Sequence, residues 1–335
     1  MIFITSLKSN ITFLFFFIGL FINPSVYGQT KIIKIIQAGS FNKNEKIYPG
    51  ANILLKRNAT RVHLFHEGAL IKSDKSYFYS KKNFFNAEGK IVFTQGDSIR
   101  MTSKYIEYNG NSKKAKAWGN VILVSPEMTL MTDTLFLDRI ENTAFYKSPG
   151  KIIDSLSILN SKEGIYYLKN KKYNFKKNVT IDNPKYKVSS TQLDYFTESN
   201  EAFFYGPSKI KGEDYDIYCE RGFYNTQTQN GNFKKNAKIF YDKKIIEGDS
   251  LYFENDKKYA SATNKIVITD TINNSIIKGD FGEIFKLKDS AIITKNALSI
   301  NILDNDSLYI HADTLLITGP IENRLIKGYY NVKIL

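Results

Sequence analysis

Residues 117–138 read AWGNVILVSPEMTLMTDTLFLD and contain two short strands joined by a polar link. The second strand, TDTLFL, recurs along the chain with an apolar or aromatic residue in the place of Leu137, at steps of 28 to 33 residues. The residues in this column are Tyr79, Tyr108, Leu137, Tyr167, Tyr195, Tyr224, Phe253, Ile284 and Ile317. A period this steady predicts stacked copies of one supersecondary unit, none of which buries its apolar face alone.

A second column lies two residues earlier, so the two columns are expected on one strand face. It contains Tyr77, Ile106, Leu135, Ile165, Leu193, Gly222, Leu251, Gly282 and Leu315. The other strand of each repeat often opens with Gly, Asn or Lys, and its inward candidates are Ile91, Phe93, Val121, Leu123, Ile152, Val179, Ile181, Ile210, Ile239, Ile266 and Ile268. Polar links such as NGNSKK and NTQTQN read as turns. We therefore predict an all-β fold of about nine two-strand repeats with almost no helix.

The start of the chain has the features of a secretory signal peptide: a lysine, a twelve-residue apolar run and small residues before Gln29. We expect cleavage after residue 28, and the alternative is an uncleaved membrane anchor. Residues 29–69 are interpreted as a lead-in with the first strands, and residues 70–335 as the repeat domain. Cys219 is the only cysteine, so no intramolecular disulfide is available, and it is expected to be a small buried side chain.

The chain carries 47 basic and 33 acidic residues, a net charge of +14. Lysines gather in the links and at outward strand positions, which favours anionic partners. An equally weighted alternative is a solvated lysine surface that protects exposed strands. Export of the chain argues against a nucleic-acid partner.

Motifs of catalysis and metal binding are missing from the sequence: it has no HExxH, GxSxG, Walker or GxGxxG pattern. His63 and His66 are three apart and are expected on opposite strand faces, which excludes a shared metal. Acidic residues recur at the head of many strands, but lysine or threonine replaces them in three repeats, so they are interpreted as turn residues or partners of nearby lysines. Trp118 is expected to be a partly buried packing residue. We predict no enzyme activity and no cofactor.

The ordered repetition of these strand pairs after a signal-like start resembles the OstA-like family, the periplasmic bridge proteins of lipopolysaccharide transport, also called organic solvent tolerance proteins. The matching stretches include residues 117–138, ATNKIVITD, EGDSLYFE and IHADTLLITG, and the pattern covers most of residues 70–335. The resemblance implies a twisted, open-ended β-jellyroll of antiparallel strands. Its apolar interior would hold lipid A acyl chains while basic groups meet the phosphates.

The resemblance also implies end-to-end strand pairing with other bridge proteins, or a head-to-tail homo-oligomer, and the sequence ends within an apparent strand that offers such an edge. The expected function is carriage of lipopolysaccharide between inner and outer membrane without chemical conversion. The candidate acyl-groove residues are Ile106, Tyr108, Val121, Leu123, Leu135, Leu137, Ile165, Tyr167, Val179, Ile181, Leu193, Tyr195, Leu251 and Phe253. Phe136 and Tyr166 are expected to point outward.

Two rival functions remain at this point. A structural or adhesive β-solenoid would have a fully packed core and capped ends. A β-helical polysaccharide lyase or hydrolase would gather polar groups in one pocket. A carrier differs from both because it needs a continuous apolar cleft.

Overall fold

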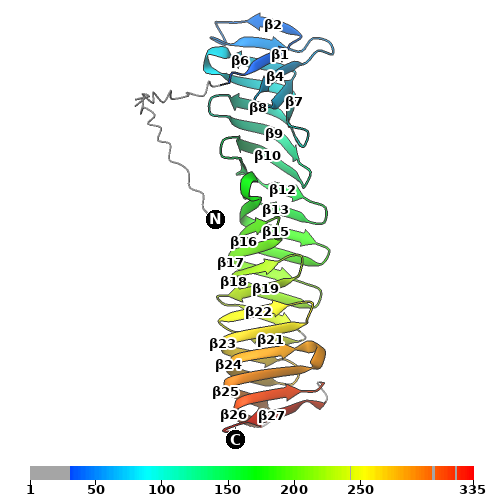
Figure 1. Ribbon diagram of the computed structural model, residues 1–335, viewed down its shortest axis with the longest axis vertical. Helices are drawn as coiled ribbons and strands as arrows, with labels where there is room; N and C mark the ends of the chain where they lie inside the picture. The colour runs from blue at the N-terminus through cyan, green and yellow to red at the C-terminus, as the bar shows by residue number, and fades with distance from the viewer. Residues whose placement is uncertain (1–30, 242, 304–305, 321–322) are drawn as a thin grey trace, which may run out of the picture. The chain divides into compact units, whose positions relative to one another are not determined.

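The structure, a computed structural model, describes residues 31–241, 243–303, 306–320 and 323–335, which form an all-β stack (Figure 1). The predicted signal peptide, residues 1–28, lies outside the described residues. The first four strands are β1 (Lys34–Gln37), β2 (Ser40–Lys43), β3 (Asn52–Leu55) and β4 (Val62–His66). The 3₁₀ helices with fully described bounds are the single turns η1 (Ser80–Lys82), η2 (Leu168–Asn170) and η3 (Lys286–Lys288). No helix of the described part is long and apolar enough to span a membrane.

Nine two-strand repeats follow β4, as predicted. Their strands are β5 (Ala69–Ser73), β6 (Lys75–Tyr79), β7 (Phe84–Gln95), β8 (Ile99–Asn109), β9 (Lys114–Val124), β10 (Thr129–Asp138), β11 (Thr143–Tyr146), β12 (Gly150–Ile153), β13 (Ile158–Ser161), β14 (Glu163–Tyr167), β15 (Lys172–Asn183), β16 (Tyr186–Phe196), β17 (Glu201–Lys211), β18 (Tyr215–Asn225), β19 (Asn230–Lys234), β20 (Lys238–Tyr241), β21 (Lys244–Glu247), β22 (Ser250–Glu254), β23 (Tyr259–Asp270), β24 (Ser275–Phe285), β25 (Ser290–Ile302), β26 (Ser307–Thr318), β27 (Leu325–Tyr329) and β28 (Lys333–Ile334). Pairs such as β11 and β12 are the two halves of one interrupted strand, because both pair with β10.

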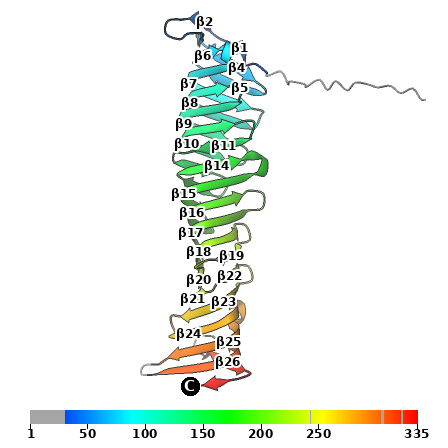
Figure 2. The ribbon, with the colours of Figure 1, turned by 90° about the vertical axis from the view of Figure 1, so that its left-hand side faces the viewer.

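Successive strands pair antiparallel with their neighbours in sequence, so the stack is one continuous meander. Thus β7 pairs with β8, β8 with β9 and β9 with β10, and the same order holds from β15 to β18. Figures 1 and 2 show these strands side by side along the stack from two directions. The predicted all-β, repeat-built fold is confirmed.

A β-bulge bends the second strand of many repeats near its middle. Gly89 and Lys90 of β7 oppose one residue of β8, and both have positive φ, at +81° and +44°. The same left-handed pair recurs at Gly119–Asn120, 177–178 and 235–236, at steps of 30, 58 and 58 residues, or one and two repeat lengths. Gly and Asn tolerate this conformation better than other residues, and a bulge increases local bend and twist. The motif predicted to open a strand is therefore a corner inside one strand.

The acidic residues that recur at strand heads lie opposite these bulges. Glu163 forms an ion pair of 2.6 Å with Lys177, and Glu220 forms one of 2.8 Å with Lys235. Farther along the chain, Asp280 accepts a hydrogen bond from Asn296. The interpretation as partners of nearby lysines is confirmed for Glu163 and Glu220, whereas Asp280 pairs with an asparagine.

The bend folds the two halves of each strand toward each other, and their inward side chains form one apolar core. Tyr215 and Tyr224 lie in opposite halves of β18, yet their hydroxyl oxygens are 2.7 Å apart. Cys219 is a free, buried thiol, and Trp118 is a half-buried residue stacked on Tyr105, both as predicted. His63 and His66 lie on opposite faces of β4, with His66 buried.

The predicted inward columns are correct in most repeats. In two repeats, those of β6 and β14, the predicted column is shifted by one residue. In β6 the buried residues are Ser76 and Phe78, whereas Tyr77 lies outside against Tyr48. Tyr79 is likewise on the outer parity of β6.

In β14 the register places Gly164 opposite the buried Tyr146, and Tyr166 opposite the buried Ala144. Ile165 and Tyr167 therefore point away from the core, and Tyr166 packs against it. Both segments have aromatic or apolar residues at both parities, so only pairing with the neighbouring strand decides the face.

Candidate functional site

Two rows of turns run along the stack and meet at a seam. The repeat turns join the two strands of one repeat, for example residues 110–113 and 139–142, and the linking turns join consecutive repeats, for example residues 67–68 and 125–128. Because each strand is bent, its two ends approach each other, and side chains of one row reach the other. The seam is therefore where access to the core is decided.

Arg139, in a repeat turn, clamps the seam near the first repeats. Its guanidinium donates hydrogen bonds to the backbone oxygens of His66 and Glu67, at 3.3 and 2.7 Å, and to Oε1 of Gln95 at 3.2 Å. It also donates to the hydroxyl of the buried Tyr108 at 2.8 Å. A guanidinium with this many acceptors fixes both rows of turns locally.

Two further clamps lie nearer the C-terminus. Lys258 Nζ is 3.1 Å from Asp214 Oδ2, and Arg324 Nη1 is 2.6 Å from Asp270 Oδ2. Burial alone would raise the pKa of Asp270, but hydrogen bonds from Asn273 and from the Arg324 guanidinium hold that pKa below its usual value. The Asp270 carboxylate thus stays charged and keeps its ion pair with Arg324.

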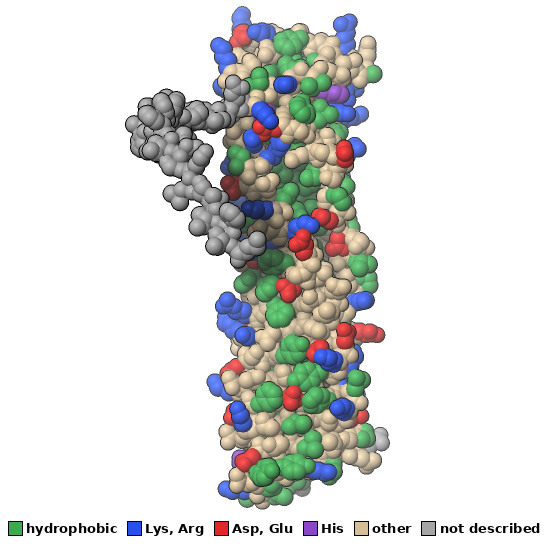
Figure 3. All heavy atoms as spheres, viewed as in Figure 1, with side chains coloured by type: hydrophobic (Ala, Val, Ile, Leu, Met, Phe, Trp, Pro, Cys, Tyr) green, Lys and Arg blue, Asp and Glu red, His purple; other side chains and the backbone are tan. Residues whose placement is uncertain are grey.

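Between the clamps of Arg139 and Lys258 the seam opens into two adjoining cavities of about 310 and 610 Å³. The two cavities share the bordering residues Glu127, Met128 and Lys171, so we describe both cavities together as the central groove. Its volume is in the range of small-molecule sites. Figure 3 shows hydrophobic side chains running along one face of the stack among charged ones.

The fourteen predicted groove residues fall into three groups. Four line the central groove: Leu123, Leu137, Ile181 and Tyr195. Eight lie in the packed core away from its lining: Ile106, Tyr108, Val121, Leu135, Val179, Leu193, Leu251 and Phe253. Two point outward and are corrected here as groove candidates, because the register of β14 turns them away from the core: Ile165 and Tyr167.

Several lining residues are not among the fourteen predicted groove residues, although one of them, Phe93, was predicted to point inward. They are Phe93, Met128, Tyr166, Tyr173, Phe175 and Tyr186. Phe93 and Phe175 have an inward strand pattern, which is a usable sequence signal. Met128 and Tyr186 flank the sequences SPE and NPK, where a turn reading hides their apolar role.

The groove wall is aromatic and poorly hydrated. Burial raises the pKa of Tyr166, Tyr173 and Tyr186, because the ionised phenolate loses solvation there. The rings of Tyr166 and Tyr173 stack at 4.3 Å with an interplanar angle of 16°. Such a surface attracts apolar groups and keeps its hydroxyls neutral at physiological pH.

The rim of the central groove has mixed charge. Glu127, Asp154 and Glu198 border it together with Lys171 and Lys185. Lys171 is tied to Glu198 by an ion pair of 3.1 Å, which raises the pKa of the lysine. Many of the clustered lysines are similarly paired, for example Lys113 with Glu67 at 2.6 Å. The expected positive surface is therefore partly neutralised at the groove.

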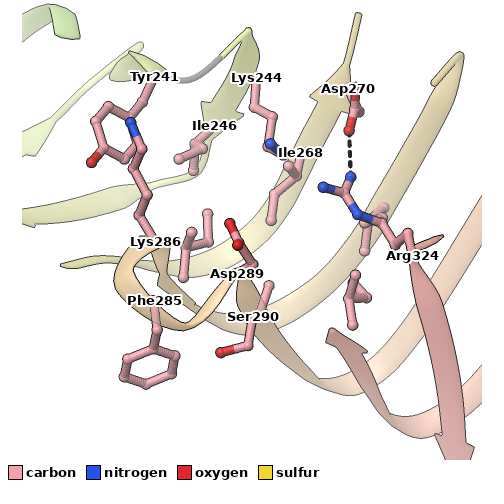
Figure 4. A pocket seen from close by; sticks show the side chains of 14 residues that line it. Tyr241, Lys244, Ile246, Ile268, Asp270, Phe285, Lys286, Asp289, Ser290 and Arg324 are labelled. Atoms are coloured by element: carbon pink, nitrogen blue, oxygen red, sulfur yellow. Dashed lines mark hydrogen bonds and ion pairs between the residues drawn. The ribbon is translucent and has the colours of Figure 1, made fainter. Parts of the chain in front are cut away.

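A third, smaller cavity lies between the clamps of Lys258 and Arg324 (Figure 4). Isoleucines from β21 to β26 line it, with Lys244, Lys286 and Asp289 at its edge. Its volume is about 60 Å³, less than the ~150 Å³ cavity known to hold a benzene ring. In this conformation it is too small for a long alkyl chain.

We compared the chain with protein families, curated proteins and solved structures. No curated protein matches it. Among solved structures, the chain is similar to LptH from Pseudomonas aeruginosa, described as the LptA-homologous periplasmic component of the conserved lipopolysaccharide transport device. The identity is 17%, the match covers 41% of this chain and 82% of LptH, and the TM-score is 0.20, which carries no conclusion about this chain.

The family model of the OstA-like protein matches residues 30–191. This segment includes the Arg139 clamp and most strands that line the central groove. The resemblance seen in the sequence is confirmed as a match of residues 30–191 to the OstA-like protein family.

Proposed function

We propose that this chain binds the acyl chains of lipopolysaccharide in the central groove and carries the lipid across the periplasm between inner and outer membrane. The observation that carries the proposal is an aromatic and aliphatic groove of about 310 and 610 Å³, open along a seam within an OstA-like chain. No chemical conversion is part of the proposal.

The groove suits an amphipathic cargo because its affinity would come from the tails. Each buried methylene contributes about 0.8 kcal/mol, so one long chain outweighs several surface contacts. An exposed lysine–phosphate pair adds at most about 1 kcal/mol, and the carboxylates of the mixed rim reduce even that. Tails would therefore supply the binding energy, and the rim would orient the head group.

We further propose that the protein is exported by cleavage near Gln29 and assembles with other bridge components by strand pairing at the ends of the stack. Edge strands with unpaired backbone groups are suited to such augmentation.

Photo-crosslinking in cells tests the cargo. A photo-reactive amino acid at Tyr166 or Leu137 should crosslink to lipopolysaccharide, because both side chains lie on the core face and line the groove. The matched controls are the neighbours Tyr167 and Phe136, on the opposite parity of the same strands, where crosslinking should be weak. Equal crosslinking at both parities would indicate surface contact only. No crosslinking at either would favour the packed, adhesive solenoid.

A further inference from the structure

The larger cavity of the central groove has more acidic than basic side chains at its mouth, although the whole chain has a net charge of +14. The charged residues that line this cavity are three acids and two lysines: Glu127, Asp154, Glu198, Lys171 and Lys185. Lys171 is already paired with Glu198, and the charge of Glu127 adds to that of Glu198 in raising the pKa of this lysine. The positive charge of the mouth is therefore largely neutralised by its own acids.

Two carboxylates of this mouth have no basic partner. Glu127 and Asp154 lie in consecutive linking turns, residues 125–128 and 154–157. Among the residues that the structure describes, no lysine or arginine forms an ion pair with either of them. Asp154 is held in place, because its Oδ1 accepts the backbone N–H groups of Leu156 and Ser157 at 2.8 and 2.6 Å. The mouth therefore presents unpaired negative charge.

The cavity wall beside these carboxylates consists of neutral tyrosine rings. Tyr173, Tyr186 and Tyr195 line the same cavity. Burial is the main reason that their pKa values are raised, and the charge of Asp154 raises each of them further. Aromatic ring faces and carboxylates both attract a cation, and carboxylates repel an anion. The composition of the mouth thus favours a positively charged group.

We propose that this cavity takes a lipid whose head group carries a positively charged amine next to its acyl chains, and that Glu127 and Asp154 recognise the ammonium group. A head group with phosphate alone would place its negative charge beside both carboxylates. The acyl chains supply most of the affinity in either case, so the carboxylates act by selecting among lipids. This inference rests on the proposed function and adds the charge class of the head group.

Three dodecyl probes with different head groups test this selection: dodecylamine, which is an ammonium ion at neutral pH, neutral dodecyl maltoside, and dodecyl phosphate. An environment-sensitive fluorophore on Leu156→Cys reports binding at the cavity, because Leu156 is exposed on its lining. Cys219, the only native cysteine, is buried and stays unlabelled. The titrations are done below the micelle concentrations and in about 0.15 M salt, which screens exposed charges farther away than about 8 Å. Distant lysines then contribute little to the comparison.

The labelled protein with its native mouth should bind dodecylamine most tightly and dodecyl phosphate least tightly. In the double variant Glu127→Gln/Asp154→Asn, each lost carboxylate should weaken dodecylamine binding by about threefold to fivefold, the effect of an exposed ion pair, and should strengthen dodecyl phosphate binding. Dodecyl maltoside has no charge, so its unchanged affinity shows that the variant is folded. Asp154→Asn keeps a side-chain oxygen for the two backbone N–H groups of the turn.

Glu213→Gln is the matched control. It removes an exposed carboxylate from the linking turn between β17 and β18, outside the lining of the central groove. Its effect on the order of the three probes should be nil. Glu127→Gln alone is the second variant if the double variant does not fold.

The outcomes separate this inference from the proposed function. Tighter binding of dodecyl phosphate than of dodecylamine, or an equal effect of the double variant and Glu213→Gln, would overturn the selection for an amine while leaving a lipid groove in place. Dodecyl phosphate that overtakes dodecylamine only after Mg²⁺ is added would overturn it too, because the carboxylates would then hold a bridging metal. Absence of binding by all three probes, together with no lipopolysaccharide crosslink at Tyr166, would remove the proposed function itself.

Discussion

A methyl group added at Gly164 should destabilise the protein, because Gly164 faces the ring of Tyr146. A Cβ at Gly164 would lie 2.5 Å from both Cζ and Oη of that ring, and Tyr146 is almost fully buried with its hydroxyl 2.6 Å from Oγ of Ser161. The ring has little room on its other side, because a Cβ at Gly150 would likewise lie too close to Cε2 of Tyr146. Gly164→Ala therefore forces the ring from a slot between two glycines.

The magnitude follows from three contributions. Overpacking costs about 1–3 kcal/mol, and a strained Tyr146–Ser161 hydrogen bond adds up to about 1 kcal/mol. Alanine also restricts the backbone of the unfolded chain, which raises the free energy of unfolding by about 0.5–1 kcal/mol and offsets part of this cost. We expect Gly164→Ala to lower the free energy of unfolding by about 1–3 kcal/mol.

Urea unfolding followed by circular dichroism measures this change. The same substitution in a Tyr146→Leu background should be nearly neutral, because the clashing ring is gone. Ile165→Thr serves as the control and should change stability by less than about 0.5 kcal/mol, since its side chain points outward. A neutral or stabilising Gly164→Ala together with a costly Ile165→Thr would show that Ile165, and not Gly164, faces the core, and the register argued above would be wrong.

Three other outcomes are expected. Cys219 should resist iodoacetamide in the folded protein and react on unfolding, because it is buried and burial raises the pKa of its thiol to about 12; reaction at the rate of a free thiol would contradict this. Burial also raises the pKa of Tyr146 and Tyr215 to about 12, above the unfolded value of about 10. The stability from these neutral phenols is present below pH 10 and falls between pH 10 and 12 by about 1.4 kcal/mol per pH unit for each tyrosine, which denaturant titration should detect as a falling urea midpoint. Ile334→Pro should weaken end-to-end assembly in light scattering while the monomer stays folded: Leu335 bonds Tyr309 of β26 in both directions, so the N–H of Ile334 points away from β26, and Ile334→Thr is the control. Assembly that is unchanged by the proline would exclude strand pairing at this edge.

The repeat and the strand face were predictable because they are local. With the register of the structure, the inward column reads Phe78, Tyr108, Leu137, Tyr166 and Tyr195, and its steps of 30, 29, 29 and 29 residues are more even than those first inferred. The inward face of the strands SYFY and GIYYL was predicted wrongly, because each strand has large side chains at both parities. A stricter reading of the period would have corrected them.

The groove itself was not predictable in this way. The clamp that borders it joins Arg139 to Glu67, which is 72 residues away in the sequence. Contacts of this kind across the seam depend on how far every strand bends. The bulges that produce the bend were seen as GN and KN pairs but were interpreted as strand starts. Met128 lies in a linking turn and Tyr186 is the first residue of β16, directly after such a turn, and at these positions the strand pattern makes no prediction.

The direction of the meander has a mechanical consequence. Each strand is hydrogen-bonded to its neighbours in sequence, so the ladder bonds of residues 31–335 lie along the direction in which the strands follow one another. Tension applied along that direction pulls each bond end-on, and bonds between adjacent strands can open one after another, as in a zipper, rather than resisting together in shear. The weakest places for such peeling are the interrupted strands, where β11 and β12 share the load that β10 carries as one piece. A chain of this construction yields gradually under a pull, and the released strands can pair again when the pull ends.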